Sequence, residues 1–331
     1  MRAAIFDGYR SISLSDAPVP DPGPGEVRVK VRNCGICGSD VSLYKSGILS
    51  GPDRILGHEV SGVIDHDPAG RWEPGTRVVV YPARGCGLCL WCTEGKPRYC
   101  LEPPSLPWGG FAEFACYPSE GLLPVPDALD DRTATLAEPL GVALRAVEMS
   151  VARPGDLALV LGLGSIGLLA VSGLVAAGCR VIGADIRGDR RLLALEMGCD
   201  DAFDPVAEDP FWKMLSFDRH GPRIAFECSG VPESLQKAFN ACGHEGIIGV
   251  LGIPFEPVTI LPAVFSVKEQ RAFSISGPSI RSMSRALDLL QERPLTARVI
   301  TGSVPLEETG EAFARLVEGT GGIKVLVAPE G

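Results

Sequence analysis

The sequence has no apolar run long enough to cross a membrane without glycine, proline or charge interrupting it. Its first residues, MRAAIFDGYRSISL, also lack the apolar stretch of a secretion signal. We therefore expect a cytoplasmic protein with no membrane partner. In a reducing cytoplasm, clustered cysteines are more often metal ligands than disulfides.

An excess of positive charge is missing as well. The chain has 31 Lys and Arg against 41 Asp and Glu, which gives a formal net charge of -10. Binding to a phosphate backbone needs clustered basic side chains, so we expect no nucleic-acid partner. Internal repeats and low-complexity segments are also absent. A length of 331 residues with 45% hydrophobic content allows two domains, each with its own core.

Cysteine, in contrast, is concentrated in one place. Residues 85–100 read GCGLCLWCTEGKPRYC and hold four of the 11 cysteines. Their spacing is typical of a closed four-thiolate zinc site, with the ligands Cys86, Cys89, Cys92 and Cys100. Two disulfides are the alternative. A site without an open position leaves no room for substrate, so we expect this zinc to be structural.

Three further turns offer metal ligands. Cys37 lies in NCGICGSD, His58 and Glu59 lie in LGHEV, and Glu138 lies in LAEPL. A site made of Cys, His and a carboxylate with a fourth position open is the form of a catalytic zinc centre. These ligands are scattered along the chain, so the spacing alone leaves structural roles for each of them open.

A dinucleotide-binding pattern begins after the apolar run 157–161. The motif residues are Gly162, Gly164, Ser165, Ile166 and Gly167, followed by a helical pattern. The glycines would let the backbone approach a pyrophosphate at a helix N-terminus. Asp185 ends the next apolar run and would accept hydrogen bonds from the adenosine ribose, which favours NAD over NADP. Arg190 follows closely and could stack on adenine or weaken that preference.

Strands and helices continue to alternate beyond this motif. The segment 224–230, which contains Cys228, is expected to be a strand that ends near the cofactor, and further strands are expected at 246–253 and 272–278. A helical pattern at 234–242 separates the first two. Such alternation predicts a parallel sheet covered by helices on both faces.

Taken in order, these motifs resemble the zinc-dependent medium-chain alcohol dehydrogenase family. The resemblance is carried by CGSD (37–40), GHE (57–59), the cysteine lobe, GGFAEF (109–114) and EPL (138–140), and it covers nearly the whole chain. The Glu-Pro-Leu setting is similar to the branch of sorbitol, polyol and threonine dehydrogenases. The resemblance implies an α/β protein with a doubly wound parallel Rossmann sheet and a mainly β, GroES-like catalytic domain. Residues 1–140 and 278–331 would form the catalytic domain and residues 141–277 the Rossmann domain.

The resemblance also implies roles for single residues. Cys37 and His58 would hold a catalytic zinc with either Glu59 or Glu138, which makes two zinc ions per chain. Ser39 would belong to the proton relay and Asp40 would orient a ligand. On the cofactor side, Leu251 would lie beside the nicotinamide and Lys324 would contact the cofactor phosphates.

The expected activity is hydride transfer between NAD and a secondary alcohol such as a polyol, cyclitol or aminocyclitol. The small-molecule partner is accordingly an alcohol or its ketone, and a homodimer or homotetramer is expected. An L-threonine 3-dehydrogenase-like enzyme is an alternative within the same class. A non-catalytic, zinc-stapled NAD-binding relative is a second alternative, although such a protein has no need of an open zinc site.

Overall fold

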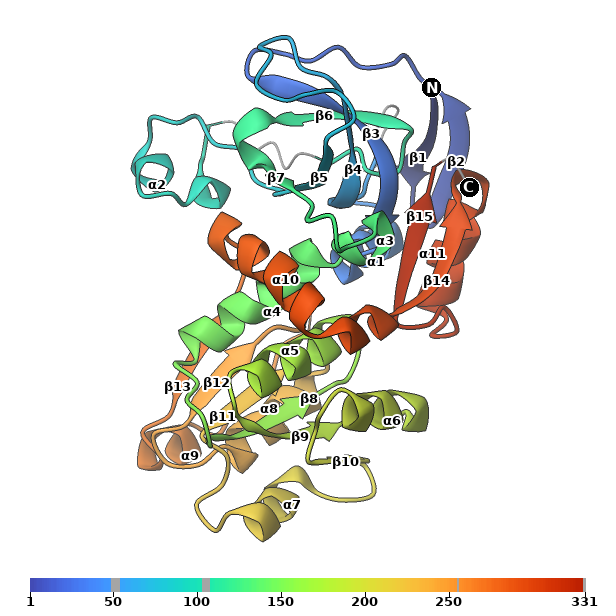
Figure 1. Cartoon of the computed structure of the whole chain (residues 1–331). Coiled ribbons are helices and arrows are strands. Elements are labelled where there is room, and N and C mark those ends of the chain that lie inside the picture. The colour runs from blue at the N-terminus through green and yellow to red at the C-terminus, as the bar shows by residue number, and fades with distance from the viewer. Residues whose placement is uncertain (49–53, 103–107, 255, 330–331) are drawn as a thin grey trace. The chain divides into compact units, whose positions relative to one another are not determined.

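The computed structural model describes residues 1–48, 54–102, 108–254 and 256–329 (Figure 1). The chain divides into two compact units. The first comprises Met1–Glu138, Ser279–Glu292 and Ile300–Gly331, and the second comprises Pro139–Pro278 and Arg293–Val299. No helix in the described ranges is long and apolar enough to cross a membrane.

The second unit is built on a parallel sheet. Its strands are β8 (Leu157–Leu161), β9 (Arg180–Ala184), β10 (Asp201–Phe203), β11 (Ile224–Glu227), β12 (Ile247–Val250) and β13 (Arg271–Ser274). They lie in the order β10-β9-β8-β11-β12-β13, and neighbouring strands pair parallel. Every residue of β8 is buried, which explains its uninterrupted apolar sequence. The direction of winding reverses beside β8, because β9 lies on one side of it and β11 on the other.

Among the described residues, five helices connect consecutive strands of this sheet: α5 (Ser165–Ala176), α6 (Gly188–Glu196), α7 (Pro210–Phe217), α8 (Pro232–Ala241) and α9 (Pro262–Val267). The unit also contains most of α4 (Ala137–Met149), which begins in the first unit and precedes β8, and η3 (Pro294–Val299). Local chemistry sets several of their starts. At α7, for example, the Asp209 side chain accepts a hydrogen bond from the backbone N–H of Phe211, and Pro210 occupies the first turn.

The first unit is mainly β. Its strands are β1 (Arg2–Gly8), β2 (Ser11–Asp16), β3 (Glu26–Gly35), β4 (Glu59–His66), β5 (Arg77–Val80), β6 (Phe114–Pro118), β7 (Leu122–Pro124), β14 (Ile300–Pro305) and β15 (Lys324–Ala328). The larger sheet has the order β14-β15-β3-β4-β5-β7, with β6 also paired to β3. In β3, Val27, Val29 and Val31 are fully buried and alternate with polar residues, as expected of a strand with one face in the core. The C-terminal strand β15 pairs with β3, so both ends of the chain build this unit.

Short helices complete the first unit. They are α1 (Gly38–Ser46), α2 (Leu90–Thr93), η1 (Pro97–Tyr99), η2 (Ser119–Gly121), α3 (Asp131–Ala134), α10 (Ile280–Glu292), η4 (Leu306–Glu308) and α11 (Thr309–Val317). In α10 the buried residues Met283, Ala286, Leu287 and Leu290 recur at helical spacing, which gives the helix one apolar face. A parallel helix-covered sheet and a mainly β unit together confirm the predicted fold class.

Candidate active site and metal centres

The four cysteines of the lobe converge on one point. The four sulfurs lie within 4.8 Å of one another and belong to Cys86, Cys89, Cys92 and Cys100. Cys89 is the N-cap of α2 and Cys92 lies within that helix, so a separation of three residues brings their sulfurs to 3.5 Å. Cys100 directly follows η1. Four converging thiols fit a closed tetrahedral zinc site.

The backbone around this lobe favours thiolate. The N–H groups of Leu88 and Cys89 donate to the sulfur of Cys86 at 3.4 and 3.3 Å. These hydrogen bonds lower the pKa of Cys86 to about 6. Removal from water raises the pKa of Cys92 to about 12 when no cation is present. A divalent cation would resolve this conflict, because it allows all four sulfurs to be anionic together.

A second cluster brings together Cys37, His58 and Glu59, whose ligand atoms also lie within 4.8 Å of one another. Cys37 is the N-cap of α1 and is separated from the end of β3 only by Ile36, and Glu59 is the first residue of β4. Gly35 pairs with Glu59 across β3 and β4, and this pairing brings the two distant segments together. A thiol, an imidazole and a carboxylate form a donor set that suits zinc with an open position.

Asp40 connects two members of this cluster. Its carboxylate is 1% exposed, and Oδ2 accepts a hydrogen bond of 3.0 Å from the backbone N–H of Cys37. Oδ1 lies 3.4 Å from Nδ1 of His58. Burial lowers the pKa of His58, but the charges of Asp40 and Cys37 outweigh burial and hold this pKa well above its ordinary value. Asp40 is therefore placed to orient the imidazole of His58 through its Nδ1.

Lys324 lies beside Glu59. Its side chain is buried, and its Nζ lies 2.7 Å from both carboxylate oxygens of Glu59. Nζ also donates to the carbonyl of Ile36 at 2.9 Å. This buried ammonium neutralises the charge of Glu59. The expected contact of Lys324 with cofactor phosphates stays a prediction.

Glu138 and Ser39, the other two residues predicted for the catalytic site, lie outside the cluster of three ligands. Glu138, in the first turn of α4, is 6% exposed but is not part of the close Cys37, His58 and Glu59 group. Burial raises the pKa of Glu138 to about 7. Ser39 lies in the first turn of α1, two residues after Cys37, and is half-buried.

The glycine motif forms the turn between β8 and α5. Gly162 has a φ of 88°, and a Cβ there would lie 2.7 Å from the backbone nitrogen of Ser229. A Cβ on Gly167 would lie 1.8 Å from the carbonyl oxygen of Gly162. Gly164 caps α5, and the hydroxyl of Ser165 is buried with no hydrogen-bond partner among the described residues. Free helix N–H groups and this hydroxyl suit an anionic group.

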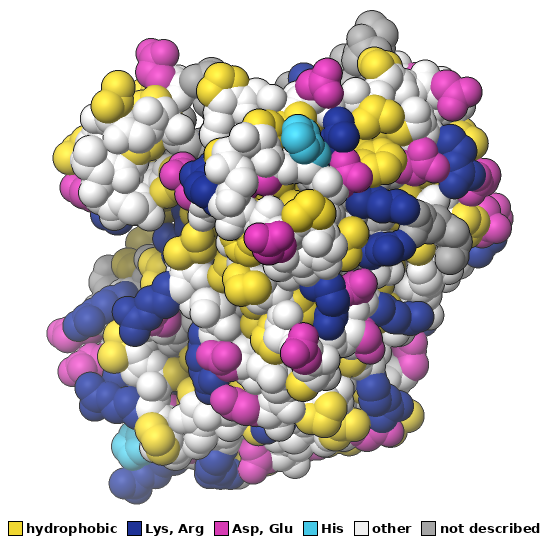
Figure 2. Space-filling model, turned by 45° about the horizontal axis from the view of Figure 1, so that its top comes forward, with side chains coloured by type: hydrophobic (Ala, Val, Ile, Leu, Met, Phe, Trp, Pro, Cys, Tyr) yellow, Lys and Arg dark blue, Asp and Glu magenta, His cyan; other side chains and the backbone are white. Residues whose placement is uncertain are grey.

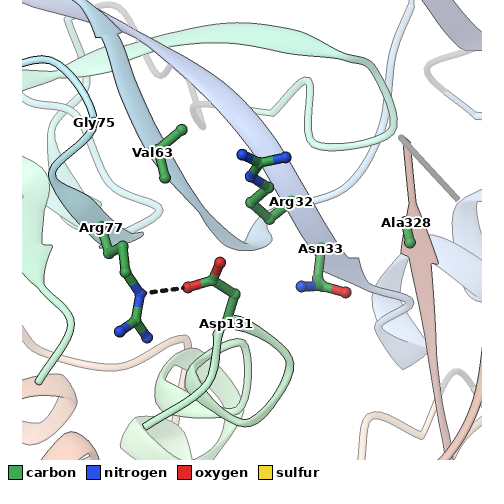
Figure 3. A pocket seen from close by; sticks show the side chains of 7 residues that line it. All are labelled: Arg32, Asn33, Val63, Gly75, Arg77, Asp131 and Ala328. Carbon is green, nitrogen blue, oxygen red and sulfur yellow. Dashed lines mark hydrogen bonds and ion pairs between the residues drawn. The ribbon is translucent and has the colours of Figure 1, made fainter. Parts of the chain in front are cut away.

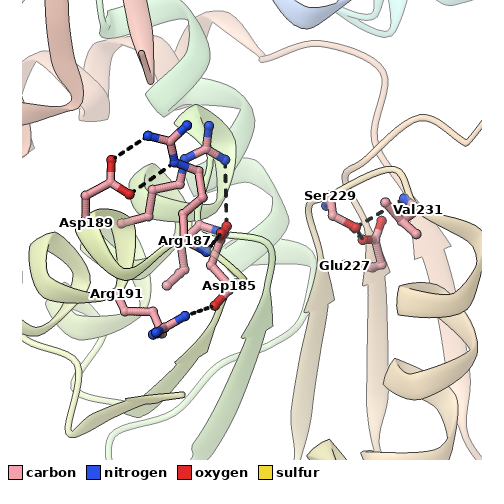
Figure 4. Close-up of polar contacts among 9 residues, drawn as sticks. Asp185, Arg187, Asp189, Arg191, Glu227, Ser229 and Val231 are labelled. Carbon is pink, nitrogen blue, oxygen red and sulfur yellow. Dashed lines mark hydrogen bonds and ion pairs between the residues drawn. The ribbon is translucent and has the colours of Figure 1, made fainter. Parts of the chain in front are cut away.

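Asp185 follows β9 at the same edge of the sheet. Its Oδ2 accepts a hydrogen bond of 2.7 Å from the N–H of Leu163. Its Oδ1 accepts one of 2.8 Å from the N–H of Arg187 (Figure 4). The guanidinium of Arg190 lies 3.7 Å from Oδ2. The carboxylate is thus fixed beside the glycine turn with an arginine close by.

The other side of this turn is formed by the ends of β11 and β12. Cys228 follows β11, and burial raises its pKa well above the ordinary value, which indicates a neutral thiol. The N–H of Leu251 donates to the carbonyl of Glu227 at 2.8 Å. Glu227, fully buried at the end of β11, was missed by the sequence analysis. The signal was present as a single acid inside the apolar segment IAFECSG.

A separate cavity of about 550 Å³ lies in the first unit (Figure 3). Its lining includes Arg32 and Asn33 of β3, Val63 of β4, and Arg77. Arg77 is already paired with Asp131 at 2.8 Å. None of the predicted site residues lines this cavity, so we do not assign the chemistry to it. On the molecular face in Figure 2, acidic and basic side chains are interspersed without an extended basic area.

Comparison with known proteins supports this chemistry. Residues 23–127 match the family described as "Alcohol dehydrogenase GroES-like domain", and residues 165–292 match "Zinc-binding dehydrogenase". A sorbitol dehydrogenase of Halalkalibacterium halodurans is 30% identical over 97% of each chain. An L-threonine 3-dehydrogenase of Bacillus subtilis is 31% identical over 98% of this chain and 96% of that protein. The crystal structure of 2R,3R-butanediol dehydrogenase from Bacillus subtilis superimposes with a TM-score of 0.89, at 29% identity and 99% coverage of both chains.

The chain therefore belongs to the zinc-dependent medium-chain alcohol dehydrogenase family and is an oxidoreductase. This confirms the family and the class of enzyme predicted from the sequence. The cysteine lobe and the Cys37, His58 and Glu59 cluster are both able to hold zinc.

Proposed function

We propose that this enzyme transfers hydride between NAD and the carbinol carbon of a secondary alcohol in a polyol, cyclitol or aminocyclitol. The observation that carries the proposal is the cluster of Cys37, His58 and the buried Glu59, with the buried carboxylate of Asp40 beside His58. The names of the relatives, sorbitol and butanediol dehydrogenase, favour substrates with neighbouring hydroxyl groups.

In this proposal Cys37 and His58 hold the catalytic zinc with one carboxylate, and Cys86, Cys89, Cys92 and Cys100 hold a structural zinc. When bound, zinc supplies a Lewis acid for the alcohol oxygen, and NAD supplies the hydride acceptor. Glu59 belongs to the ligand cluster, although Lys324 engages both of its oxygens. Glu138 is the alternative carboxylate. Zinc content of Glu59→Gln and Glu138→Gln variants distinguishes them, because only loss of the true ligand reduces bound zinc.

The other residues have supporting roles. Asp40 holds the imidazole of His58 so that one ring nitrogen faces the metal position. Ser39, two residues from Cys37, is assigned to receive the proton of the substrate hydroxyl. Ser42 donates to the carbonyl of Gly38 at 3.0 Å, within the turn of its own helix, so it is not assigned to the relay. A proton leaving Ser39 would continue through water.

For the cofactor, we propose that the glycine turn holds the pyrophosphate and Asp185 the adenosine ribose. A carboxylate at that place repels a 2′-phosphate, which favours NAD, and Arg190 weakens the preference. Residues 1–140 and 278–331 are accordingly assigned to catalysis, and residues 141–277 to the dinucleotide.

We also propose that the enzyme is a homodimer or homotetramer. The support is β13, an end strand of the parallel sheet whose residues are mostly exposed. Among the described strands β13 pairs only with β12, so its outer backbone edge is available for another chain. Light scattering coupled to size exclusion measures the assembly, and a monomer would overturn this part. The cytoplasmic location stays a prediction.

The experiment that tests the function is NAD⁺ reduction with a panel of polyols, cyclitols, aminocyclitols and L-threonine, followed by NADH absorbance. Turnover on one of the first three classes is expected. Turnover on L-threonine alone would establish the second candidate, which the relative from Bacillus subtilis favours by its name. Absence of turnover in a protein that binds both zinc and NAD would indicate a non-catalytic relative.

A further inference from the structure

Glu227 is a buried acid that the proposed chemistry does not use. It ends β11, and its side chain is 0% exposed. Its Oε1 accepts hydrogen bonds from the N–H of Ser229, at 2.8 Å, and from the hydroxyl of Ser229. Its Oε2 accepts from the N–H of Gly230 at 3.2 Å. Figure 4 shows this carboxylate enclosed by the turn that follows its own strand.

The same residue also fixes a second turn. The backbone carbonyl of Glu227 accepts hydrogen bonds of 2.8 Å from the N–H groups of both Leu251 and Gly252, which follow β12. A Cβ on Gly252 would lie 2.5 Å from Oε2 of Glu227 and 2.3 Å from the nitrogen of Gly230. The turns after β11 and β12 are therefore packed against each other with this carboxylate between them.

The turns after β11 and β12 lie at the same end of the sheet as the glycine motif. Asp185 lies at the end of β9, on one side of β8, whereas Glu227 lies at the end of β11, on the other side. The 228–230 turn reaches the glycine motif, because a Cβ on Gly162 would lie 2.7 Å from the nitrogen of Ser229. A dinucleotide with its adenosine ribose at Asp185 and its pyrophosphate at the glycine turn extends its nicotinamide half over β11 and β12.

We propose that Glu227 is a positioning residue for the nicotinamide half of the cofactor, which it serves by holding the 228–230 and 251–252 turns in place. The inference rests on the proposed function, since it requires a bound dinucleotide. A carboxylate is needed because three donors, all from Ser229 and Gly230, point at its oxygens. A glutamine that keeps its carbonyl oxygen at Ser229 would turn its NH₂ group toward the N–H of Gly230 and leave that donor unsatisfied.

The test compares two ligands in Glu227→Gln, Glu227→Asp and the wild-type protein. AMP reports on the adenosine half alone, and NADH reports on the whole dinucleotide. Glu233→Gln is the matched control, because Glu233 is exposed in the first turn of α8 and undergoes the same chemical change. Dissociation constants come from calorimetry, and KM and kcat come from NADH formation.

In Glu227→Gln we expect NADH binding to weaken about 10-fold or more, the scale of a lost hydrogen bond to a charged group. AMP binding should stay within about twofold of the wild type, because Asp185 and the glycine turn are unchanged. Glu227→Asp should recover part of the loss, since it keeps an acceptor-only side chain. The control should bind both ligands as the wild type does.

Equal losses for AMP and NADH would make Glu227 a general structural residue and overturn the inference, as would no loss for either. If Glu227→Gln does not fold, Ser229→Ala tests the same point, because it removes only the hydroxyl donor and leaves the Glu227 carboxylate its two backbone N–H donors. A selective but smaller loss for NADH is expected there, and no selectivity would contradict the inference. A wild-type protein that binds neither ligand would instead remove the proposed function, and this inference with it.

Discussion

The buried ion pair between Lys324 and Glu59 allows a quantitative prediction. Lys324→Met keeps a long unbranched side chain but removes the ammonium that lies 2.7 Å from both oxygens of Glu59. The remaining carboxylate would be 1% exposed and without its partner. Removing one member of a buried pair costs about 3–5 kcal/mol of stability. At roughly 2–4 °C per kcal/mol for a unit of this size, Tm should fall by about 6–20 °C.

The assay is thermal unfolding followed by circular dichroism. Lys45→Met is the matched control, because Lys45 is exposed in the last turn of α1 and its loss should change stability by less than about 0.5 kcal/mol. Samples are compared at equal zinc content per chain. A Lys324→Met protein as stable as the control would refute the pairing. Weaker binding of AMP by this variant would support the contact with cofactor phosphates that the sequence analysis expects of Lys324.

Three further predictions concern the cofactor turn and the two metal centres. Gly167→Ala should abolish NADH binding in a fluorescence titration without loss of zinc, because the added Cβ would lie 1.8 Å from the carbonyl of Gly162; unchanged binding would contradict the assigned turn. Asp40→Asn should lower kcat/KM about 10–100-fold, because the imidazole of His58 would no longer be held by a carboxylate, and Tm should change little. Full activity of this variant would show that the contact is dispensable. The lowered pKa of Cys86 contributes stability that is present above the ordinary pKa of a thiol and is lost as pH falls through about 6. Zinc release from the lobe, measured with a chromogenic chelator, should therefore begin at or below about pH 6. Release well above that pH would refute the thiolate assignment.

Features encoded locally were predicted well from the sequence. The cysteine spacing forms a compact lobe because its ligands lie within one short segment. The glycine motif likewise lies between a strand and a helix that are consecutive in the chain. The helix expected at 234–242 is observed at Pro232–Ala241, because its apolar residues recur at helical spacing.

Features that depend on tertiary pairing were not predictable in the same way. The contact between Lys324 and Glu59 joins residues 265 apart in the sequence and exists because β15 lies beside β3. No local pattern distinguishes a lysine that neutralises a buried acid from one that contacts a phosphate. The strand expected at 272–278 is shorter, Arg271–Ser274, since it lies at the end of the sheet and pairs only with β12 among the described strands.

The most direct test of the central claim is zinc per chain in the wild type, Cys37→Ser and Cys92→Ser, measured together with NAD⁺-dependent turnover. The account predicts two zinc ions and turnover for the wild type. Cys37→Ser should keep one zinc and lose turnover, whereas Cys92→Ser should lose the other zinc and stability. One zinc in the wild type, unchanged in Cys37→Ser, would contradict a catalytic metal at Cys37, His58 and a carboxylate.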